Sequence, residues 1–474
     1  DRFLEMRKEV LSQWPTGKEV VLEEAVEYQR SLPESKNFTK VTERVRKEGK
    51  TLIWPRAGTP VLEDEIALVK TLVELGIRHI PVTIDSYTRL SQFDKAQQAL
   101  EESIRTGRPM LNGYPIVNYG VKNTRKLVES VDAAFSPRGA VKLAMEIALA
   151  SGMTASGKSS FLEFGSYEKR TTLEQCIEAS QYTNRLTGYY ADRGVIITTD
   201  LHGWIPSGVF PFSVNIASMI VDSLIAAEQG VKSIMPNTHC LGHMAQDIAW
   251  MRLTPRLLRE YLDRFGYEDV VIPGILANQL PLFPFPQGMG GAFAYLNYTA
   301  MVAALAEAEA AHVRTIDEGA GIATKESHIL SYESANWILD VVRTQKIKFE
   351  IDGVETEEKV TEVEVRAILD KLLELGDGDI VIGSIKGVEA GVLDSPFSPN
   401  INVKDNVLGV RDNTGACRYL EFGNLPIPKE IKEFHREKIA ERERAEGRKI
   451  DYQVAVEDLW ALSKGRIVGV PTGA

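Results

Sequence analysis

The sequence predicts an α/β fold: a (β/α)8 barrel of the TIM type, with an N-terminal helical extension and a smaller C-terminal α+β domain. From Thr51 onward, short apolar runs rich in β-forming residues alternate with longer segments of helical period, a pattern typical of parallel strands joined by crossover helices. This alternating region, 51–346, is somewhat longer than the roughly 250 residues of a typical barrel. No glycine-rich dinucleotide fingerprint follows the first apolar run, which disfavours an open nucleotide-binding sheet.

The elements follow from this alternation. Residues 1–50 are highly charged and have apolar side chains at helical spacing, so we expect a helical extension there. A barrel takes eight strands, but nine runs resemble strands, of which 159–164 is the weakest. A separate C-terminal domain is expected over 347–474. The predicted strands are 51–54, 79–83, 110–117, 133–135, 159–164, 194–199, 233–236, 270–276 and 312–316, and the predicted helices are 61–76, 92–106, 139–151, 171–193, 213–232, 240–265 and 292–311.

Charge and composition exclude several classes of protein. The chain has 55 Lys and Arg residues against 66 Asp and Glu residues, and this net charge of −11 argues against electrostatic binding of nucleic acid. Its three cysteines form no Cys-x-x-Cys pair, which is typical of a reducing compartment. The most apolar stretch, 292–311, carries two glutamates, which disfavours a membrane span. We therefore expect a cytoplasmic protein that binds neither nucleic acid nor membrane.

Candidate site residues lie where the predicted strands end, because functional side chains of a (β/α)8 barrel come from the C-terminal ends of its strands. Arg56 and Arg89 at one mouth suit a small carboxylic acid or dicarboxylic acid, since a guanidinium group pairs bidentately with a carboxylate. The alternative is that each arginine only bridges neighbouring loops. The other polar or glycine residues at these ends are Gly58, Asp85, Asn112, Asp200, His202, Arg314 and Glu318.

Two motifs suggest rival chemistries. The segment 152–159, GMTASGKS, matches the phosphate-loop pattern and keeps a P-loop-type nucleotide hydrolase open as an alternative. That chemistry needs a strand before the loop and a helix after it, whereas a helical pattern precedes this segment, so we interpret the match as a coincidence. His239 and His243 could share a metal from one helix, but no third ligand is evident, so capping and core packing are the expected roles.

Five segments carry a resemblance to a known family: WPRAGTP, VTIDSYTR, MLNGYPIVNYGVK, LIAAEQGVK and VRDNTGACRYLEFGNLPIP at 410–428. They resemble the large subunit of glutamate mutase, also called methylaspartate mutase, and the similarity extends over essentially the whole chain. The resemblance implies a (β/α)8 barrel with a C-terminal domain. It also implies an isomerase that interconverts (S)-glutamate and threo-3-methylaspartate by radical chemistry with adenosylcobalamin.

The resemblance also implies partners. In the family, a homodimer of large subunits assembles with two copies of a small cobalamin-binding subunit, giving a heterotetramer. The histidine that ligates cobalt belongs to an Asp-x-His-x-x-Gly motif of that small subunit, and this motif does not occur in the present chain. A corrinoid would therefore lie between the barrel mouth and a separate protein.

The site residues implied by the resemblance fall into two groups. Arg56 and Arg89 match two of three arginines that clasp the substrate, Tyr167 matches a substrate-contacting tyrosine, and Asp200 replaces a pocket glutamate. Positions expected to contact the cofactor are Gly58, Asn112, Phe285, Arg314, Glu318 and Ile322, with Glu318 at the adenosyl ribose and Arg314 in place of a lysine.

Several pocket positions depart from the family. By spacing, Phe135 takes the place of the third arginine and Gly157 that of the glutamate that handles the substrate's amino group; Glu163 replaces a tyrosine and Ser166 a proline. Either Arg138 or Lys158 supplies the missing charge and preserves a dicarboxylate substrate, or an apolar and roomier pocket accepts a related acid. A further alternative is that the chain is a catalytically inactive relative of the mutase.

Overall fold

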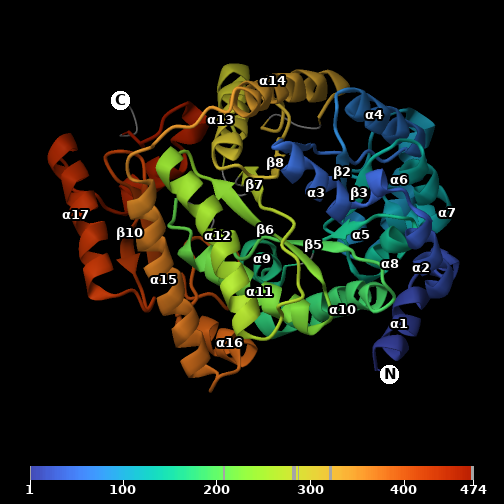
Figure 1. Cartoon of the computed structure of the whole chain (residues 1–474), viewed down its shortest axis with the longest axis horizontal. Coiled ribbons are helices and arrows are strands. Elements are labelled where there is room, and N and C mark those ends of the chain that lie inside the picture. The colour runs from blue at the N-terminus through green and yellow to red at the C-terminus, as the bar shows by residue number, and fades with distance from the viewer. Residues whose placement is uncertain are drawn as a thin grey trace.

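The computed structural model describes residues 2–157, 159–205, 209–279, 284–286, 288–319 and 323–470. Its centre is a curled parallel sheet (Figure 1). Six strands pair in the order β1-β8-β7-β6-β5-β4, and β2 pairs with β3. The strands are β1 Leu52–Trp54, β2 His79–Thr83, β3 Ala134–Arg138, β4 Ala155–Ser156, β5 Thr198–Leu201, β6 Ser233–Cys240, β7 Leu276–Gln279 and β8 Ala310–His312.

Backbone contacts link the β2–β3 pair to both edges of the six-stranded sheet. The N–H of Ala57, just after β1, donates to the carbonyl of Pro81 in β2 at 3.3 Å. The N–H of Thr154, just before β4, donates to the carbonyl of Phe135 in β3 at 3.0 Å. The α/β alternation predicted from the sequence is therefore confirmed as a curled sheet of parallel strands.

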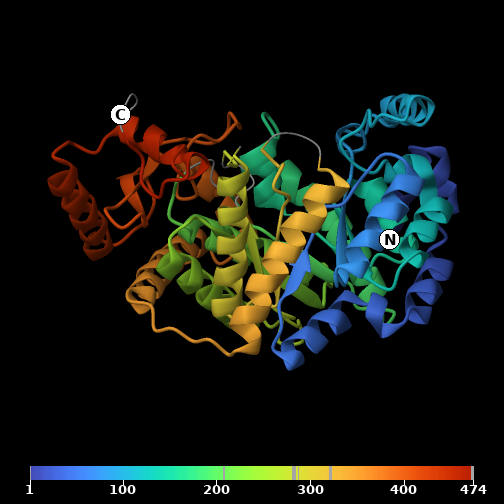
Figure 2. The ribbon, with the colours of Figure 1, turned by 90° about the horizontal axis from the view of Figure 1, so that it is seen from above.

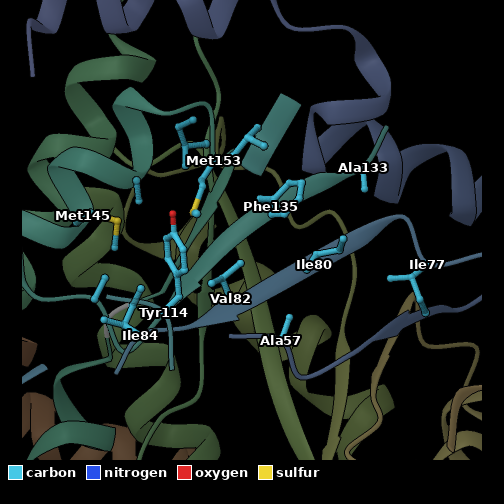
Figure 3. Close-up of a cluster of buried hydrophobic side chains, with 14 of the residues drawn as sticks. Ala57, Ile77, Ile80, Val82, Ile84, Tyr114, Ala133, Phe135, Met145 and Met153 are labelled. Atoms are coloured by element: carbon cyan, nitrogen blue, oxygen red, sulfur yellow. The ribbon is translucent and has the colours of Figure 1, made fainter. Parts of the chain in front are cut away.

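Helices cover the outside of this sheet, and the strand side chains alternate between two environments, as a strand requires. Ile53, Ile80 and Phe135 belong to a large apolar cluster beneath the helices. Figure 3 shows Ile80 and Phe135 within this cluster. Trp54 and Ala134 belong to a second cluster inside the curl. The covering helices are α4 Leu62–Glu74, α7 Ile116–Glu129, α8 Lys142–Ala150, α10 Leu173–Ala191, α11 Ser213–Glu228, α12 Met244–Arg264, α13 Met289–Leu305 and α14 Lys325–Thr344. A further helix, α6 Phe93–Thr106, packs against α7.

The N-terminal segment closes the end of the curl where the strands begin. It contains α1 Arg2–Ser12, α2 Leu22–Ser31 and α3 Phe38–Glu48. Phe38 at the start of α3 is fully buried, with its ring centre 5.4 Å from that of Trp54 and 4.4 Å from that of His79. This aromatic layer fills the N-terminal end of the curl and leaves the C-terminal ends of the strands for polar side chains.

The C-terminal segment contains α15 Val354–Leu375, α16 Ile380–Ala390, β9 Val407–Arg411, β10 Cys417–Phe422, α17 Lys429–Glu446 and α18 Tyr452–Leu459. β9 and β10 pair antiparallel. Figure 2 shows these elements at the opposite end of the molecule from the N-terminal helices. Leu369 of α15 and Leu257 of α12 lie in one apolar cluster, so the segment packs directly onto the helices of the curled sheet.

Some element predictions were wrong. The run 110–117 is irregular up to the start of α7 at Ile116, and 159–164 forms α9 Ser160–Leu162 and the start of a π-helical turn, Glu163–Tyr167. The strand in this part of the chain is β4, two residues inside the glycine-rich segment 152–159, too short to show an alternating pattern. In the part of the chain that the structure describes, no helix combines the length and apolar character needed to cross a membrane.

Candidate active site

Two arginines converge on Glu318 at the C-terminal edge of the sheet. Arg56 follows β1 and its Nη1 donates to Glu318 Oε1. Arg314 follows β8 and its Nη1 donates to the same oxygen at 2.9 Å. No described residue bonds to Oε2 of Glu318, so this oxygen can accept hydrogen bonds from a ligand.

The backbone around Arg56 is fixed by α14 and by a buried carboxyl group. The Arg56 N–H donates to the Tyr332 hydroxyl at 3.0 Å, and the Arg56 carbonyl accepts from His328 Nε2 at 2.6 Å. Gly58 has φ +125°, and a Cβ there would lie 2.5 Å from the carbonyl oxygen of Thr83, so this turn requires glycine. Glu65 accepts from the Gly58 and Thr59 N–H groups at 3.2 and 2.7 Å.

Arg89 lies at the end of a short helix, α5 Ser86–Arg89, after β2. Asp85 caps this helix by accepting from the Thr88 N–H, and Asn112 Oδ1 accepts from the Ser86 N–H at 2.9 Å. The Arg89 side chain passes directly over Gly139, where an added Cβ would lie 2.5 Å from Arg89 Cδ. Within the described ranges its guanidinium group has no hydrogen bond or ion pair, so Arg89 is an exposed cation free to bind an anion.

Arg138 at the end of β3 forms the third cationic group. It donates to Asp200 Oδ2, and its Nη2 lies 3.1 Å from His202 Nε2. Burial alone would raise the pKa of Asp200, but the charge of Arg138 holds this pKa below its ordinary value. Because a guanidinium group can only donate, His202 Nε2 accepts, and burial keeps the pKa of His202 low and its ring neutral.

A row of polar side chains extends from Asp200 across the next three strands. Asn237 Nδ2 lies 3.4 Å from Asp200 Oδ2, Asn278 Nδ2 lies 3.4 Å from Asn237 Oδ1, and His312 Nδ1 lies 2.8 Å from Asn278 Oδ1. Burial, followed by the charges of Arg314, Arg138 and Arg56, holds the pKa of His312 well below its ordinary value. His312 is therefore a neutral imidazole near three guanidinium groups.

Tyr167 and Gly157 complete the edge. Partial loss of solvent raises the pKa of Tyr167, whose side chain is 49% exposed, while the charges of Arg314, Arg89 and Arg138 oppose the rise. A Cβ at Gly157 would lie 2.7 Å from Asp200 Oδ1, an oxygen that has no hydrogen-bond partner among the described residues. The Asp200 carboxylate thus occupies the space that a side chain at 157 would fill.

The expectation that Phe135 lines the pocket was wrong. Phe135 is fully buried in the cluster between β3 and the covering helices, beside Ile80 and Met153 (Figure 3). Side chains of a strand alternate between its faces, so Ala134 and Arg138 point into the curl while Phe135 points out. Arg138 is therefore the charged residue that β3 contributes to this edge.

The remaining predicted cofactor residues lie near the same edge or outside the described residues. A Cβ at Gly319, beside Glu318, would lie 3.2 Å from the carbonyl oxygen of Phe285, so the Phe285 backbone lies against this loop. The Phe285 ring centre is 5.8 Å from that of Tyr295. Ile322 and Lys158 lie outside the described residues.

The structure does not support the two rival motifs. Segment 152–159 follows a helix, α8, and contains β4, whereas a phosphate loop follows a strand. The N–H groups of Ser160 and Phe161, which would face a phosphate in a phosphate loop, donate to buried Asp222 at 3.1 and 3.3 Å. His239 lies in β6 and His243 caps α12 by accepting from the Gln246 N–H, so the two histidines do not share a helix.

Sequence reasoning missed His312, Asn237 and Asn278. Their signal was the period-two alternation of strands. His312 stands two residues before Arg314 and therefore on the same face of the chain. Asn237 directly follows the predicted strand run 233–236, and Asn278 lies two residues after the run 270–276, where side chains at the C-terminal edge are expected.

A curled parallel sheet with charged side chains gathered at its C-terminal edge has the architecture of an α/β enzyme. Residues 32–471 match the family described as methylaspartate mutase E chain. The chain belongs to this family, and so to a family of isomerases.

Relatives named glutamate mutase epsilon subunit align along nearly their whole length. The chain is 38% identical to that of Desulfitobacterium hafniense strain Y51, over 99% of this chain and 98% of the relative. It is 36% identical to that of Treponema denticola, over 99% and 97%, and 37% identical to that of Escherichia coli O157:H7, over 99% and 98%. A solved aldolase, DAHP synthase of Thermotoga maritima, has a TM-score of only 0.37 at 10% identity, covering 64% of this chain and 71% of that one.

Proposed function

We propose that this chain is the large catalytic subunit of an adenosylcobalamin-dependent carbon-skeleton mutase. Its reaction would interconvert L-glutamate and threo-3-methylaspartate, or closely related amino dicarboxylates. The observation that carries the proposal is the convergence of Arg56, Arg89 and Arg138 on one edge of the sheet in a chain of the methylaspartate mutase family. Such a set of guanidinium groups can bind two carboxylates and fix their orientation.

The proposed scaffold is a closed (β/α)8 barrel over 51–346, preceded by the extension 1–50 and followed by a C-terminal domain over 347–474. The bonds from Ala57 to Pro81 and from Thr154 to Phe135 support closure, since each joins the β2–β3 pair to one edge of the six-stranded sheet. Closure would place all the strand ends around a single mouth.

Arg138 is proposed as the third arginine of the substrate clasp, instead of Lys158. Its guanidinium group pairs with Asp200 and lies, like that of Arg89, within electrostatic reach of Tyr167. A substrate carboxylate would exchange with Asp200 on Arg138 and bind Arg89 directly. This arrangement supports a dicarboxylate substrate, and altered specificity, if present, would then come from Gly157, Glu163 and Ser166.

The residues at the edge fit adenosylcobalamin. Glu318 has one free carboxylate oxygen for the hydroxyl groups of a ribose, and Arg314 and Phe285 lie beside its loop. Gly58, Asn112 and Ile322 are proposed as further cofactor-contacting residues. When bound, the cofactor supplies an organic radical that abstracts hydrogen from the substrate.

The chain's own residues would bind the substrate, orient it and exclude water. Arg56, Arg89 and Arg138 would hold carboxylates, Arg56 and Arg314 would also hold Glu318 in place, and Tyr167 would contact the substrate. The aromatic layer of Phe38, Trp54 and His79 seals the opposite end of the sheet against solvent. Excluding water from the site matters because it prevents side reactions of reactive intermediates.

The proposed assembly is a cytoplasmic heterotetramer, in which two copies of this chain pair and each binds a small subunit that ligates cobalt. The name epsilon subunit, carried by the relatives, supports a multi-subunit enzyme. A P-loop hydrolase is disfavoured because Asp222 occupies the amides after the glycine-rich segment. An inactive relative is disfavoured because Arg56, Arg89 and Glu318 are all present.

The test is reconstitution. The purified chain is mixed with a cognate small subunit and adenosylcobalamin, and candidate acids are added while electron paramagnetic resonance is recorded. We expect a paramagnetic cobalt signal that depends on an amino dicarboxylate. No signal with any amino or 2-oxo dicarboxylate, together with ATP hydrolysis that Lys158→Ala abolishes, would instead establish the hydrolase.

A further inference from the structure

The row from Asp200 to His312 has a defined direction of hydrogen bonding. Asp200 is ionised and can only accept, and the carbonyl of Leu201, 3.3 Å from the same Asn237 nitrogen, can only accept as well. Asn237 must therefore present its NH2 group to both of them. The reversed amide would place its oxygen against two acceptors.

This orientation propagates along the row. Asn237 Oδ1 faces Asn278, so Asn278 presents its NH2 group to it at 3.4 Å. Asn278 Oδ1 then faces His312 Nδ1 at 2.8 Å, and an oxygen acceptor requires a proton on that nitrogen. The charge on Asp200 in β5 thereby sets the tautomer of a histidine in β8, three strands away.

A neutral ring protonated on Nδ1 has a lone pair on Nε2. No described residue bonds to Nε2 of His312, and the side chain is only partly buried. Around it lie Arg314, Arg138 and Arg56, which can only donate. The carboxylates of a dicarboxylate would engage these donors, but an ammonium group of the same molecule needs acceptors.

We infer that His312 Nε2 accepts a hydrogen bond from the ammonium group of the substrate, with Asp200, Asn237 and Asn278 as positioning residues that hold the ring in its accepting tautomer. This inference rests on the proposed function and deepens it, because it names the group that would recognise the amino end of an amino dicarboxylate. It assigns a role to Asn237, Asn278 and His312, which have none in the arginine clasp.

The tautomer is measured by 15N NMR on the full chain labelled at histidine, without cofactor or substrate. The His312 resonances are assigned by their loss in His312→Gln. We expect a pyrrole-type Nδ1 and a pyridine-type Nε2. A ring protonated on Nε2 overturns the inference, whatever the activity of the enzyme.

The relay is tested by Asn278→Ala, which removes the acceptor of the His312 Nδ1 proton. We expect the His312 nitrogen shifts to move toward the Nε2-protonated form. The matched control is Asn297→Ala, because Asn297 bonds to Ser334 on α14 and lies outside the row. Unchanged His312 shifts in Asn278→Ala would overturn the positioning role.

The ligand is tested by calorimetric binding of L-glutamate and of glutarate, which has the same carboxylates without the amino group. We expect His312→Leu to weaken glutamate binding roughly tenfold or more and glutarate binding less than about threefold. His312→Gln, whose amide oxygen can accept, should retain most of the glutamate affinity. Equal losses with both ligands contradict the ammonium assignment. A wild-type chain that binds neither ligand contradicts the proposed function, and the nitrogen shifts then still decide whether the relay exists.

Discussion

Arg89 and Arg138 come together because of one glycine. Gly139 has φ +76°, and the aliphatic part of Arg89 lies where its side chain would be. Arg89 is thereby led across the end of β3 toward Arg138, although it starts from a different strand end. A free guanidinium group next to a paired one offers a carboxylate both an immediate contact and an exchangeable one.

Arg89→Lys should lower kcat/KM of the reconstituted enzyme at least roughly tenfold, because an ammonium group cannot reproduce the fork of a guanidinium group. The measurement is steady-state turnover over a range of substrate concentrations. Arg44→Lys, on an exposed position of α3, is the control and should leave turnover unchanged. Unaltered kinetics in Arg89→Lys would remove this residue from the site.

Gly139→Ala should raise KM several-fold by displacing the Arg89 side chain. Alanine also strains a backbone with positive φ, at a cost of roughly 1 kcal/mol. Gly194→Ala reports this strain separately, since Gly194 has φ +77° and nothing within 4 Å of an added Cβ. We expect the two variants to have similar melting temperatures. Only Gly139→Ala should have a raised KM. A KM equal to wild type in Gly139→Ala would show that substrate binding does not depend on the position of the Arg89 side chain over Gly139.

Sequence could predict Arg56, Arg89, Arg314 and Glu318 as neighbours, because each follows a recognisable strand run. It could not choose between Phe135 and Arg138. Matching by spacing placed Phe135 in the pocket, whereas the pleat of β3 turns it outward and leaves Arg138 facing the curl. Phe135 and Arg138 are three residues apart, so they point to opposite faces of the strand. Which of them faces the pocket depends on the orientation of β3, which spacing alone does not give.

Among the elements, the long periodic helices were predicted and the short or interrupted elements were not. α7 was missed because its regular pattern is broken by Gly120, which has φ +70° within the helical segment. β4 was missed because it is two residues long. The strands that carry the site, by contrast, are followed by polar residues, and these residues made the strand ends recognisable in the sequence.

The turn after β1 depends on a buried carboxyl group of α4. Burial raises the pKa of Glu65 to about 7, against the opposing hydrogen bonds from Thr59 and Gly58. The folded state therefore holds this proton more tightly than the unfolded chain does, so stability falls as pH rises from about 4.5 to 7 and is then level.

Glu65→Gln removes this titration. Relative to wild type, the free energy of unfolding of Glu65→Gln should rise by about 2 to 3 kcal/mol between pH 5 and pH 8. Urea unfolding at the two pH values measures it. Glu63→Gln, exposed on the same helix, is the control. A constant difference between Glu65→Gln and wild type would show that Glu65 is ionised throughout.

At the scale of the whole molecule, the C-terminal segment shares its core with the curled sheet's helices. The apolar cluster that contains Leu257 of α12 also contains Leu369 and Leu372 of α15. Arg411 of β9 donates to the carbonyl of Leu241, just after β6, at 2.6 Å. The segment thus buttresses the loop that follows a site-bearing strand.

Leu369→Ala should therefore destabilise the whole chain by about 2 to 5 kcal/mol, because it leaves a cavity in this shared core. Tryptophan fluorescence and circular dichroism during thermal unfolding should give one coincident transition at a lower temperature. Ile401→Ala, at a side chain 73% exposed, should change little. Two separate transitions would indicate that the segments fold independently.

The central claim is a rearranged carbon skeleton, and the formation of a methyl group tests it most directly. L-Glutamate has no methyl group and 3-methylaspartate has one, so 1H NMR of the reconstituted mixture distinguishes them without a coupled assay. We predict a methyl doublet that grows only when this chain, the small subunit, adenosylcobalamin and glutamate are all present. Its absence, with the cofactor bound and the subunits assembled, would contradict the account.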